Sequence, residues 1–469
     1  MNAKHEAAPG TASGAEGAYV KISLKEKLGY ALGDFSTNII WTAISTFLAF
    51  FYTDVAGISA AAVGTILFVT RFLDGVADLG VGVLVDKTKS RHGKARPWLL
   101  WMGIPFGLSV MLLFTAPDLG PTGSIIYAFV TYLIVNLLYS AINIPYGVLN
   151  SLMTQEPYER SLINIFRMVL AISGGVMISV ATMPVVQMFG GGRQGWIITF
   201  VIIGLIAPFL YLITFKTTKE RVRPTVVQKE VPLKRGVAAV FRNKYWLLIV
   251  GYSALIFIAQ GLGSALNIYY AQYVLKNAGL VGLLALASLL PIVVGIILSA
   301  PLVKKFGKRN TSLIGLAVSL IGALLLFVDP TNLQLVLASI VIKNLGLAPS
   351  VAIGNALFAD TVEYGEWKTG IRTEGLIFSG GSLASKIGSG LGGAVVGWAL
   401  AWGGYVSKLE VQPDSAVTAI KILFMYVPIA ILAVQILLML LYKLDQKYPQ
   451  IVEDLKAIAS ERDREAGRN

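Results

Sequence analysis

The chain has no cysteine among its 469 residues, which excludes a disulfide framework and a catalytic thiol. It has only two histidines, His5 and His92, and no Gly-x-x-x-x-Gly-Lys loop that would hold nucleotide phosphates. Charged residues make up 14% of the chain, against roughly 25% in soluble domains. These absences argue against an enzyme, and we expect no organic cofactor and no resident metal.

Apolar sequence is what the chain has in abundance. Hydrophobic residues reach 55% of the composition, and the mean hydropathy is +0.70. A membrane helix must span about 30 Å of hydrocarbon, which takes about 20 apolar residues. Twelve segments satisfy this, near residues 29–53, 60–86, 98–116, 122–153, 160–188, 195–215, 246–274, 279–303, 311–328, 332–358, 373–402 and 415–442. The sequence therefore predicts an all-α membrane protein with twelve transmembrane helices.

Basic residues alternate between the loops that connect these segments. One set of loops is basic and includes DKTKSRHGKARP and KKFGKRN, whereas the other set, including APDLGPTG and DPTN, has few basic residues. The net charge of +13 therefore orients a membrane protein and does not indicate a nucleic-acid partner. The positive-inside rule places both termini in the cytoplasm. Residues 1–18 lack the apolar stretch of a cleaved signal peptide.

The two halves of the chain resemble each other. GVLVDKTKSRHGKARP follows the second segment and PLVKKFGKRN the eighth, while LMTQEPYERSLINIFR follows the fourth and LFADTVEYGEWKTGIR the tenth. Two six-helix repeats with a shared site near the midplane are the plan of the major facilitator fold. We expect a disordered cytoplasmic tail at 1–27, a six-helix bundle at 28–215, a cytoplasmic loop at 216–245, a second bundle at 246–442 and a cytoplasmic tail at 443–469.

Two aspartates, Asp74 and Asp78, lie one helical turn apart within the second apolar segment. Their spacing of four places both carboxylates on one face of a helix, together with Arg71. A single lysine, Lys386, lies within the eleventh segment. Ionised groups in hydrocarbon are costly and need a cavity or a partner. One interpretation is a structural ion pair between helices. The other, which two acids against one base favour, is a site for Na⁺ or H⁺.

Several motifs, in order along the chain, resemble those of one transporter family. They are LGYALGDF, FYTDVAG, TRFLDGVAD, SRHGKARPW, INIPYG and ADTVEYGEWKTGIRTEG. Over about residues 28–440 the chain is similar to the glycoside–pentoside–hexuronide:cation symporters of the major facilitator superfamily. The resemblance implies a symporter of the bacterial cytoplasmic membrane whose partners are a small-molecule sugar, a monovalent cation and membrane lipid. Nothing in the sequence requires more than a monomer.

The resemblance also implies a cation site formed by the two acids with hydroxyl and lysine side chains. Its residues here are Asp74, Asp78, Ser140, Ser382 and Lys386. Relatives that use sodium well tend to carry an amide just before the second acid, where this chain has Ala77. Sodium needs several oxygen ligands, whereas a proton needs only one carboxylate of suitable pKa. We therefore favour H⁺ as the coupling ion, with Na⁺ at Asp74 and Asp78 as the alternative.

A sugar site is expected beside this cation site. Its candidate residues are Asn38, Trp41, Tyr139, Asn143, Tyr146, Arg167, Lys343, Asn355 and Lys386. Asn38 and Asn143 stand where melibiose permease has acids, and Arg167 matches an arginine of the family, whereas Lys343 has no counterpart in its common pattern. Asparagine donates as well as accepts and does not repel an anion. These residues favour an acidic glycoside such as a glucuronide, although Lys343 could instead snorkel or pair with a distant acid.

A further set of charged residues lies at the expected cytoplasmic ends of the helices. We expect it to form gating salt bridges that break in each transport cycle, through Asp86, Arg91, Asp360, Glu363, Glu366 and Arg372. Two alternative functions stay open. One is a lysolipid or drug carrier on the same fold, and the other is a sensor that binds sugar without transporting it.

Overall fold

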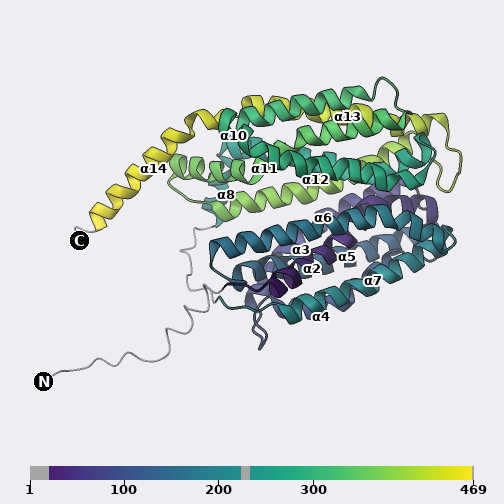
Figure 1. The fold of residues 1–469 in the computed structure, drawn as a ribbon, viewed down its shortest axis with the longest axis horizontal. Helices are drawn as coiled ribbons and strands as arrows, with labels where there is room; N and C mark the ends of the chain where they lie inside the picture. Colours follow the sequence, from purple (N-terminus) through teal and green to yellow (C-terminus); the bar gives the residue numbers. More distant parts are fainter. Residues whose placement is uncertain (1–20, 223–232, 467–469) are drawn as a thin grey trace. The chain divides into compact units, whose positions relative to one another are not determined.

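The computed structural model describes residues 21–222 and 233–466, and nearly all regular structure in these ranges is helical (Figure 1). The helices of the first half are α2 (Leu24–Phe50) with its continuation η2 (Phe51–Val55), α3 (Ala60–Lys87), α4 (Arg96–Leu113), α5 (Gly120–Met153), α6 (Pro157–Met188) and α7 (Gly192–Thr217). Each corresponds to one predicted segment. The breaks between them fall at turn residues such as Gly57, Gly93 and Gly191, whose positive φ suits glycine.

The second half begins with a short helix, α8 (Leu233–Phe241). It continues with α9 (Lys244–Tyr269), η3 (Tyr270–Val274), η4 (Ala278–Leu280), α10 (Val281–Leu325), α11 (Leu333–Thr369), α12 (Glu374–Trp402), α13 (Asp414–Leu441) and α14 (Leu444–Ala466). The 45 residues of α10 are two helices that meet at Gly307, where φ is 78° and ψ is 169°. This kink separates the predicted eighth and ninth segments.

Ten helices in the described ranges are long and apolar enough to cross a membrane. α10 is counted once among them although Gly307 divides it, and α12, rich in glycine and serine, is not counted. Including α12 and both parts of α10, the described chain contains all twelve predicted segments. The expectation of an all-α protein with twelve membrane-length helices is confirmed for the described residues.

Three helices begin or lie where we expected irregular chain. α2 already begins at Leu24, because the Ser23 side chain accepts the Glu26 N–H and so caps the helix. Glu26 also pairs with Arg221 at 2.7 Å, and its carboxylate raises the pKa of that guanidinium above the ordinary value. α8 lies within the expected central loop. The expected C-terminal tail contains α14, whose residue Ile451 is buried.

The contacts of the chain divide it into two compact units. The first comprises Met1–Ile58 and Leu73–Val227, and the second comprises Ser59–Phe72 and Gln228–Asn469. The division cuts α3, which we had expected to lie wholly in the first bundle. The first half of α3 packs on α12, since a Cβ atom at Gly397 would lie 2.6 Å from the Ala60 carbonyl oxygen. Each half of this helix therefore has its own packing environment.

In the first unit α2 packs against α6 and α7, and α4 packs against α5 and α7. The α4 and α7 backbones are closest at two glycines. A Cβ atom at Gly107 would lie 2.2 Å from the Gly204 carbonyl oxygen, and one at Gly204 would lie 2.7 Å from the Gly107 carbonyl oxygen. Small residues allow this approach, which gains van der Waals contact where lipid supplies no hydrophobic drive.

The second unit repeats this kind of packing. α10 packs on α11 and α9 on α12, and Figure 1 draws α10 and α11 running beside each other. A Cβ atom at Gly315 would lie 2.4 Å from the Gly346 carbonyl oxygen, so α10 and α11 also meet through glycines. α14 attaches to α11, where the Trp367 indole N–H donates to Asp454 at 2.9 Å.

One anchoring contact occurs in both halves of the chain. After α7, the Glu220 carboxylate accepts the backbone N–H groups of Lys94, Ala95 and Arg96 at 2.8, 2.9 and 2.9 Å. After α13, the Asp445 carboxylate accepts the Arg309 N–H at 2.8 Å, just past the kink in α10. In the first half an acid after α7 therefore caps the start of α4, and in the second half an acid after α13 caps the start of the second part of α10. The predicted sequence repeat thus has a structural counterpart.

Candidate functional site

The predicted cation residues of the first unit include a buried pair. The Ser140 hydroxyl of α5 donates a 2.8 Å hydrogen bond to Asp74 Oδ1 of α3, and both residues are buried. Asp78 follows one turn later on the same helix and is half-buried. The helix geometry of α3 therefore aligns the two carboxylates, and α5 supplies a hydroxyl oxygen to the first. Two carboxylates and a hydroxyl are hard oxygen ligands, which suit a proton or a small cation.

The remaining predicted cation residues lie on α12 in the second unit. Ser382 is exposed and Lys386, one turn further along, is half-buried. The Lys386 carbonyl accepts the Ser389 hydroxyl at 3.1 Å, so the helix is regular here. One turn after Lys386 the backbone of α12 lies close to α3: a Cβ atom at Gly390 would lie 2.6 Å from Arg71 Cβ. The glycines of α12 thus allow a close approach to the first half of α3.

One acid that the predicted sugar site did not include is Asp34 of α2, in the first unit. Its carboxylate Oδ2 lies 3.5 Å from Nε of Arg167 on α6. The Asn38 amide, one turn along α2, donates to the Asp34 carbonyl at 2.9 Å and to its carboxylate at 3.4 Å. Asp34 is visible in the motif LGDF, but only the packing of α2 against α6 pairs it with Arg167. Two predicted sugar residues, Asn38 and Arg167, are thereby brought together.

The predicted aromatic residues have different environments. Trp41 and Tyr139 contact each other with ring centroids 4.8 Å apart, and both are half-buried. Tyr146 is only 1% exposed and stacks on Tyr30 at 4.4 Å. Its hydroxyl donates to the Tyr30 carbonyl at 2.7 Å, and the Tyr30 hydroxyl donates to the Tyr146 carbonyl at 3.0 Å. This arrangement packs Tyr146 against Tyr30, whereas Trp41 and Tyr139 stay partly exposed.

Lys343 and Asn355 lie on α11 in the second unit. The Lys343 ammonium lies over the Phe424 ring of α13, 5.6 Å from its centroid. Phe424 is itself stacked on Tyr270 with centroids 3.8 Å apart. Such a position is a cation–π contact within the unit. Asn355 is exposed.

The predicted gating residues in the second unit interact within that unit. Asp360 pairs with Lys308, and Glu363 accepts the Tyr448 hydroxyl at 3.5 Å. Arg372 donates to Glu366 at 2.8 Å and to Glu374 at 3.2 Å, and the hydrogen bond to Glu366 raises the pKa of Arg372.

In the first unit Arg91 donates to the His92 ring at 3.0 Å. The side chain of Asp86 lies outside those that the structure describes. The gating role of all six residues stays a prediction.

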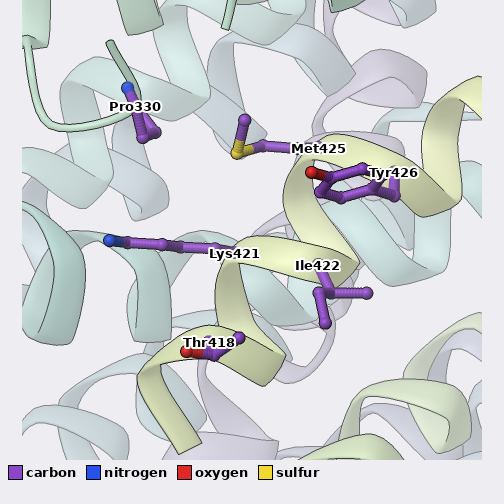
Figure 2. A pocket seen from close by; sticks show the side chains of 6 residues that line it. All are labelled: Pro330, Thr418, Lys421, Ile422, Met425 and Tyr426. Atoms are coloured by element: carbon purple, nitrogen blue, oxygen red, sulfur yellow. The ribbon is translucent and has the colours of Figure 1, made fainter. Parts of the chain in front are cut away.

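A pocket of about 570 Å³ lies in the second unit, beside α13 and the loop that follows α10. Figure 2 shows its lining side chains, Pro330, Thr418, Lys421, Ile422, Met425 and Tyr426. None of the predicted site residues contributes to it. Its walls are mainly apolar, so it lacks the converging polar groups that fix a sugar.

Comparison with known proteins identifies the class. Residues 29–446 match the family described as MFS/sugar transport protein. The isoprimeverose transporter of Lactiplantibacillus pentosus is 34% identical, with 92% of this chain and 91% of that protein aligned. The glucuronide carrier protein homolog of Escherichia coli (strain K12) is 33% identical over 93% of this chain and 96% of its own length.

The fold is also that of solved transporters. The crystal structure of the nucleoside transporter NupG superposes with a TM-score of 0.60, at 16% identity, over 89% of this chain and all of that one. The chain therefore belongs to the major facilitator family of sugar transporters, within its glycoside–pentoside–hexuronide:cation symporter branch. It is a multi-pass membrane transporter and not an enzyme.

Proposed function

We propose that the protein is a cation-coupled symporter that imports a glycoside across the bacterial cytoplasmic membrane by alternating access, with both termini in the cytoplasm. The observation that carries the proposal is the buried contact between Ser140 and Asp74, one turn from Asp78. A buried carboxylate in a membrane protein is costly, and such groups mark ion or proton paths. Binding of a cation would relieve the repulsion between the two acids, which couples ion binding to sugar binding.

For the coupling ion we propose H⁺. Ala77, which precedes the second acid, offers no oxygen to a bound metal ion. A sodium site needs several oxygen ligands, whereas protonation needs only one carboxylate. Ser382 and Lys386 stay predicted members of the cation site. The expectation of a monomer in contact with membrane lipid stays part of the same proposal.

For the substrate, two contacts argue against the acidic glycoside that the sequence favoured. Arg167 already faces the Asp34 carboxylate at 3.5 Å. Lys343 lies over the Phe424 ring of α13. Both cations on which an anionic sugar would depend therefore have other neighbours. The relatives include an isoprimeverose transporter and a glucuronide carrier homolog, so their names support a glycoside without choosing its charge.

We expect Lys343→Met to leave sugar selectivity unchanged, because methionine keeps the length of the side chain and its contact with the Phe424 ring. Uptake of a glucoside and of the matching glucuronide should change by the same factor, because neither sugar would contact this side chain. The ratio of the two initial rates in proteoliposomes measures this. A selective loss of glucuronide uptake would restore Lys343 as a contact for an acidic sugar.

The central test is uptake into proteoliposomes of a glucoside and its glucuronide, each driven by an imposed proton gradient and, separately, by a sodium gradient. Proton-driven accumulation supports the proposal as it stands. Sodium-driven accumulation would overturn the assignment of the ion and keep the symporter. If neither sugar is accumulated, pentosides and sulfosugars are the next substrates to test. Failure of every sugar would overturn the proposal in favour of a lysolipid or drug carrier, and binding without accumulation would indicate a sensor.

A further inference from the structure

Asp34 and Arg167 neutralise each other's charge, and both side chains are partly exposed. In the first unit the two side chains keep 17% and 34% of their surface exposed. Their neighbours fix the geometry from behind. Tyr30 and Tyr146 are stacked and buried, the Tyr30 side chain interacts with Arg167, and Asn38 donates to the Asp34 carboxylate. An accessible ion pair on a rigid support is a suitable surface for a ligand rich in hydroxyl groups.

The length of the contact leaves room for such a ligand. Oδ2 of Asp34 and Nε of Arg167 are 3.5 Å apart, whereas charge-assisted hydrogen bonds are about 2.7–2.9 Å. The pair is therefore held by charge more than by a tight hydrogen bond. Nε itself is buried, so a sugar hydroxyl would accept from the terminal N–H groups of the guanidinium while it donates to the carboxylate, because a hydroxyl has both functions. An uncharged sugar thus satisfies both groups without separating their charges.

An anionic sugar would bind this ion pair less favourably than an uncharged sugar. A carboxylate that binds Arg167 must displace Asp34 or lie beside it. Two like charges a few ångströms apart repel each other even at the effective dielectric of a protein surface. Asp34 already balances the positive charge of the Arg167 guanidinium, so a second anion gains little net attraction there. The neighbouring amides and tyrosines carry no charge that would offset this repulsion.

We propose that Asp34 sets the charge class of the substrate: its carboxylate occupies Arg167, so that the site accepts an uncharged glycoside and rejects a hexuronide. The proposal rests on the proposed sugar transport. It assigns a specificity-determining role to Asp34, which lies one turn before the predicted sugar residue Asn38. The Asn38 amide donates to the Asp34 carboxylate at 3.4 Å and so helps to orient it.

The experiment compares wild type with Asp34→Asn in proteoliposomes. Counterflow of a glucoside and of its glucuronide is measured at equal sugar concentration. The counterflow assay needs no ion gradient. Wild type should prefer the glucoside by at least about tenfold. Asp34→Asn keeps the shape but removes the charge, so Arg167 becomes available to an anion, and the ratio should shift toward the glucuronide by about tenfold.

Asp34→Glu is the matched control, because it keeps the charge and should keep the preference for the uncharged sugar. The double variant Asp34→Asn with Arg167→Gln removes both charges and should not gain the glucuronide. Equal or better transport of the glucuronide by wild type overturns the inference, even if Asp34→Asn does not fold. An unchanged ratio in a folded, active Asp34→Asn protein also overturns it. Failure of wild type to exchange any sugar would instead overturn the proposed function.

Discussion

Asp78→Asn is expected to abolish uphill accumulation of sugar while leaving sugar counterflow measurable. The asparagine keeps the shape of the side chain but can neither bind a proton at neutral pH nor balance a cation. The partner acid Asp74, with its hydrogen bond from Ser140, stays in place. Accumulation driven by a proton gradient should fall to the level reached without a gradient. The measurement is the ratio of inside to outside sugar at steady state in proteoliposomes.

The control for this variant is Asp118→Asn, because Asp118 lies in the loop between α4 and α5 and outside the predicted site. It should accumulate sugar as wild type does. Ser140→Ala should have an intermediate effect, because it removes one hydrogen bond to Asp74 but leaves the charge. Full accumulation by Asp78→Asn would contradict the cation site. Loss of both accumulation and counterflow would instead indicate that Asp78 is needed for sugar binding or folding.

Gly107→Ala should destabilise the first unit strongly, although the added group is only one methyl. Alanine ordinarily stabilises a helix relative to glycine by about 1 kcal/mol. Here the Cβ atom would lie 2.2 Å from the Gly204 carbonyl oxygen of α7, so two backbones must separate. Overpacking typically costs about 1–3 kcal/mol and outweighs the gain in helix propensity. Thermal unfolding of the detergent-solubilised protein should show a clearly lower midpoint than wild type.

Gly147→Ala gives the matched comparison within the same unit. Gly147 lies in α5, and a Cβ atom there would meet no atom within 4 Å. Its unfolding midpoint should equal or exceed that of wild type, because only the helix propensity changes. A normal midpoint for Gly107→Ala would mean that α4 and α7 do not approach as closely as the structure has them.

In the second unit the predicted gating acids have partners outside α11, and one partner lies on α14. The acids Asp360, Glu363 and Glu366 interact with Lys308, Tyr448 and Arg372. Tyr448 belongs to α14, a helix that sequence reasoning treated as a tail. α14 has too few apolar residues for a membrane-length signal, although Leu444 and Ile451 are buried. Its docking depends on tertiary contacts such as that between Trp367 and Asp454.

Short-range pattern accounts for most of what could be predicted. The length of each apolar run determined the number of helices, because a membrane helix must cover a fixed thickness and satisfy its own backbone. The spacing of Asp74 and Asp78 determined that they share a face, because helix periodicity is local. The repeat of loop motifs indicated two halves, which the caps at Glu220 and Asp445 now match.

What the sequence by itself determined about this protein is therefore its class, its helices and the alignment of its acid pair, which follow from hydropathy and helix geometry. Only the tertiary structure decided which side chains from distant helices meet. It placed Asp34 beside Arg167 and the Lys343 ammonium over Phe424. Those contacts depend on how helices rotate and pack against one another. Between α2 and α6 the backbones approach closely at Gly174, where a Cβ atom would lie 3.0 Å from the Phe35 carbonyl oxygen. A linear pattern carries no direct record of such packing.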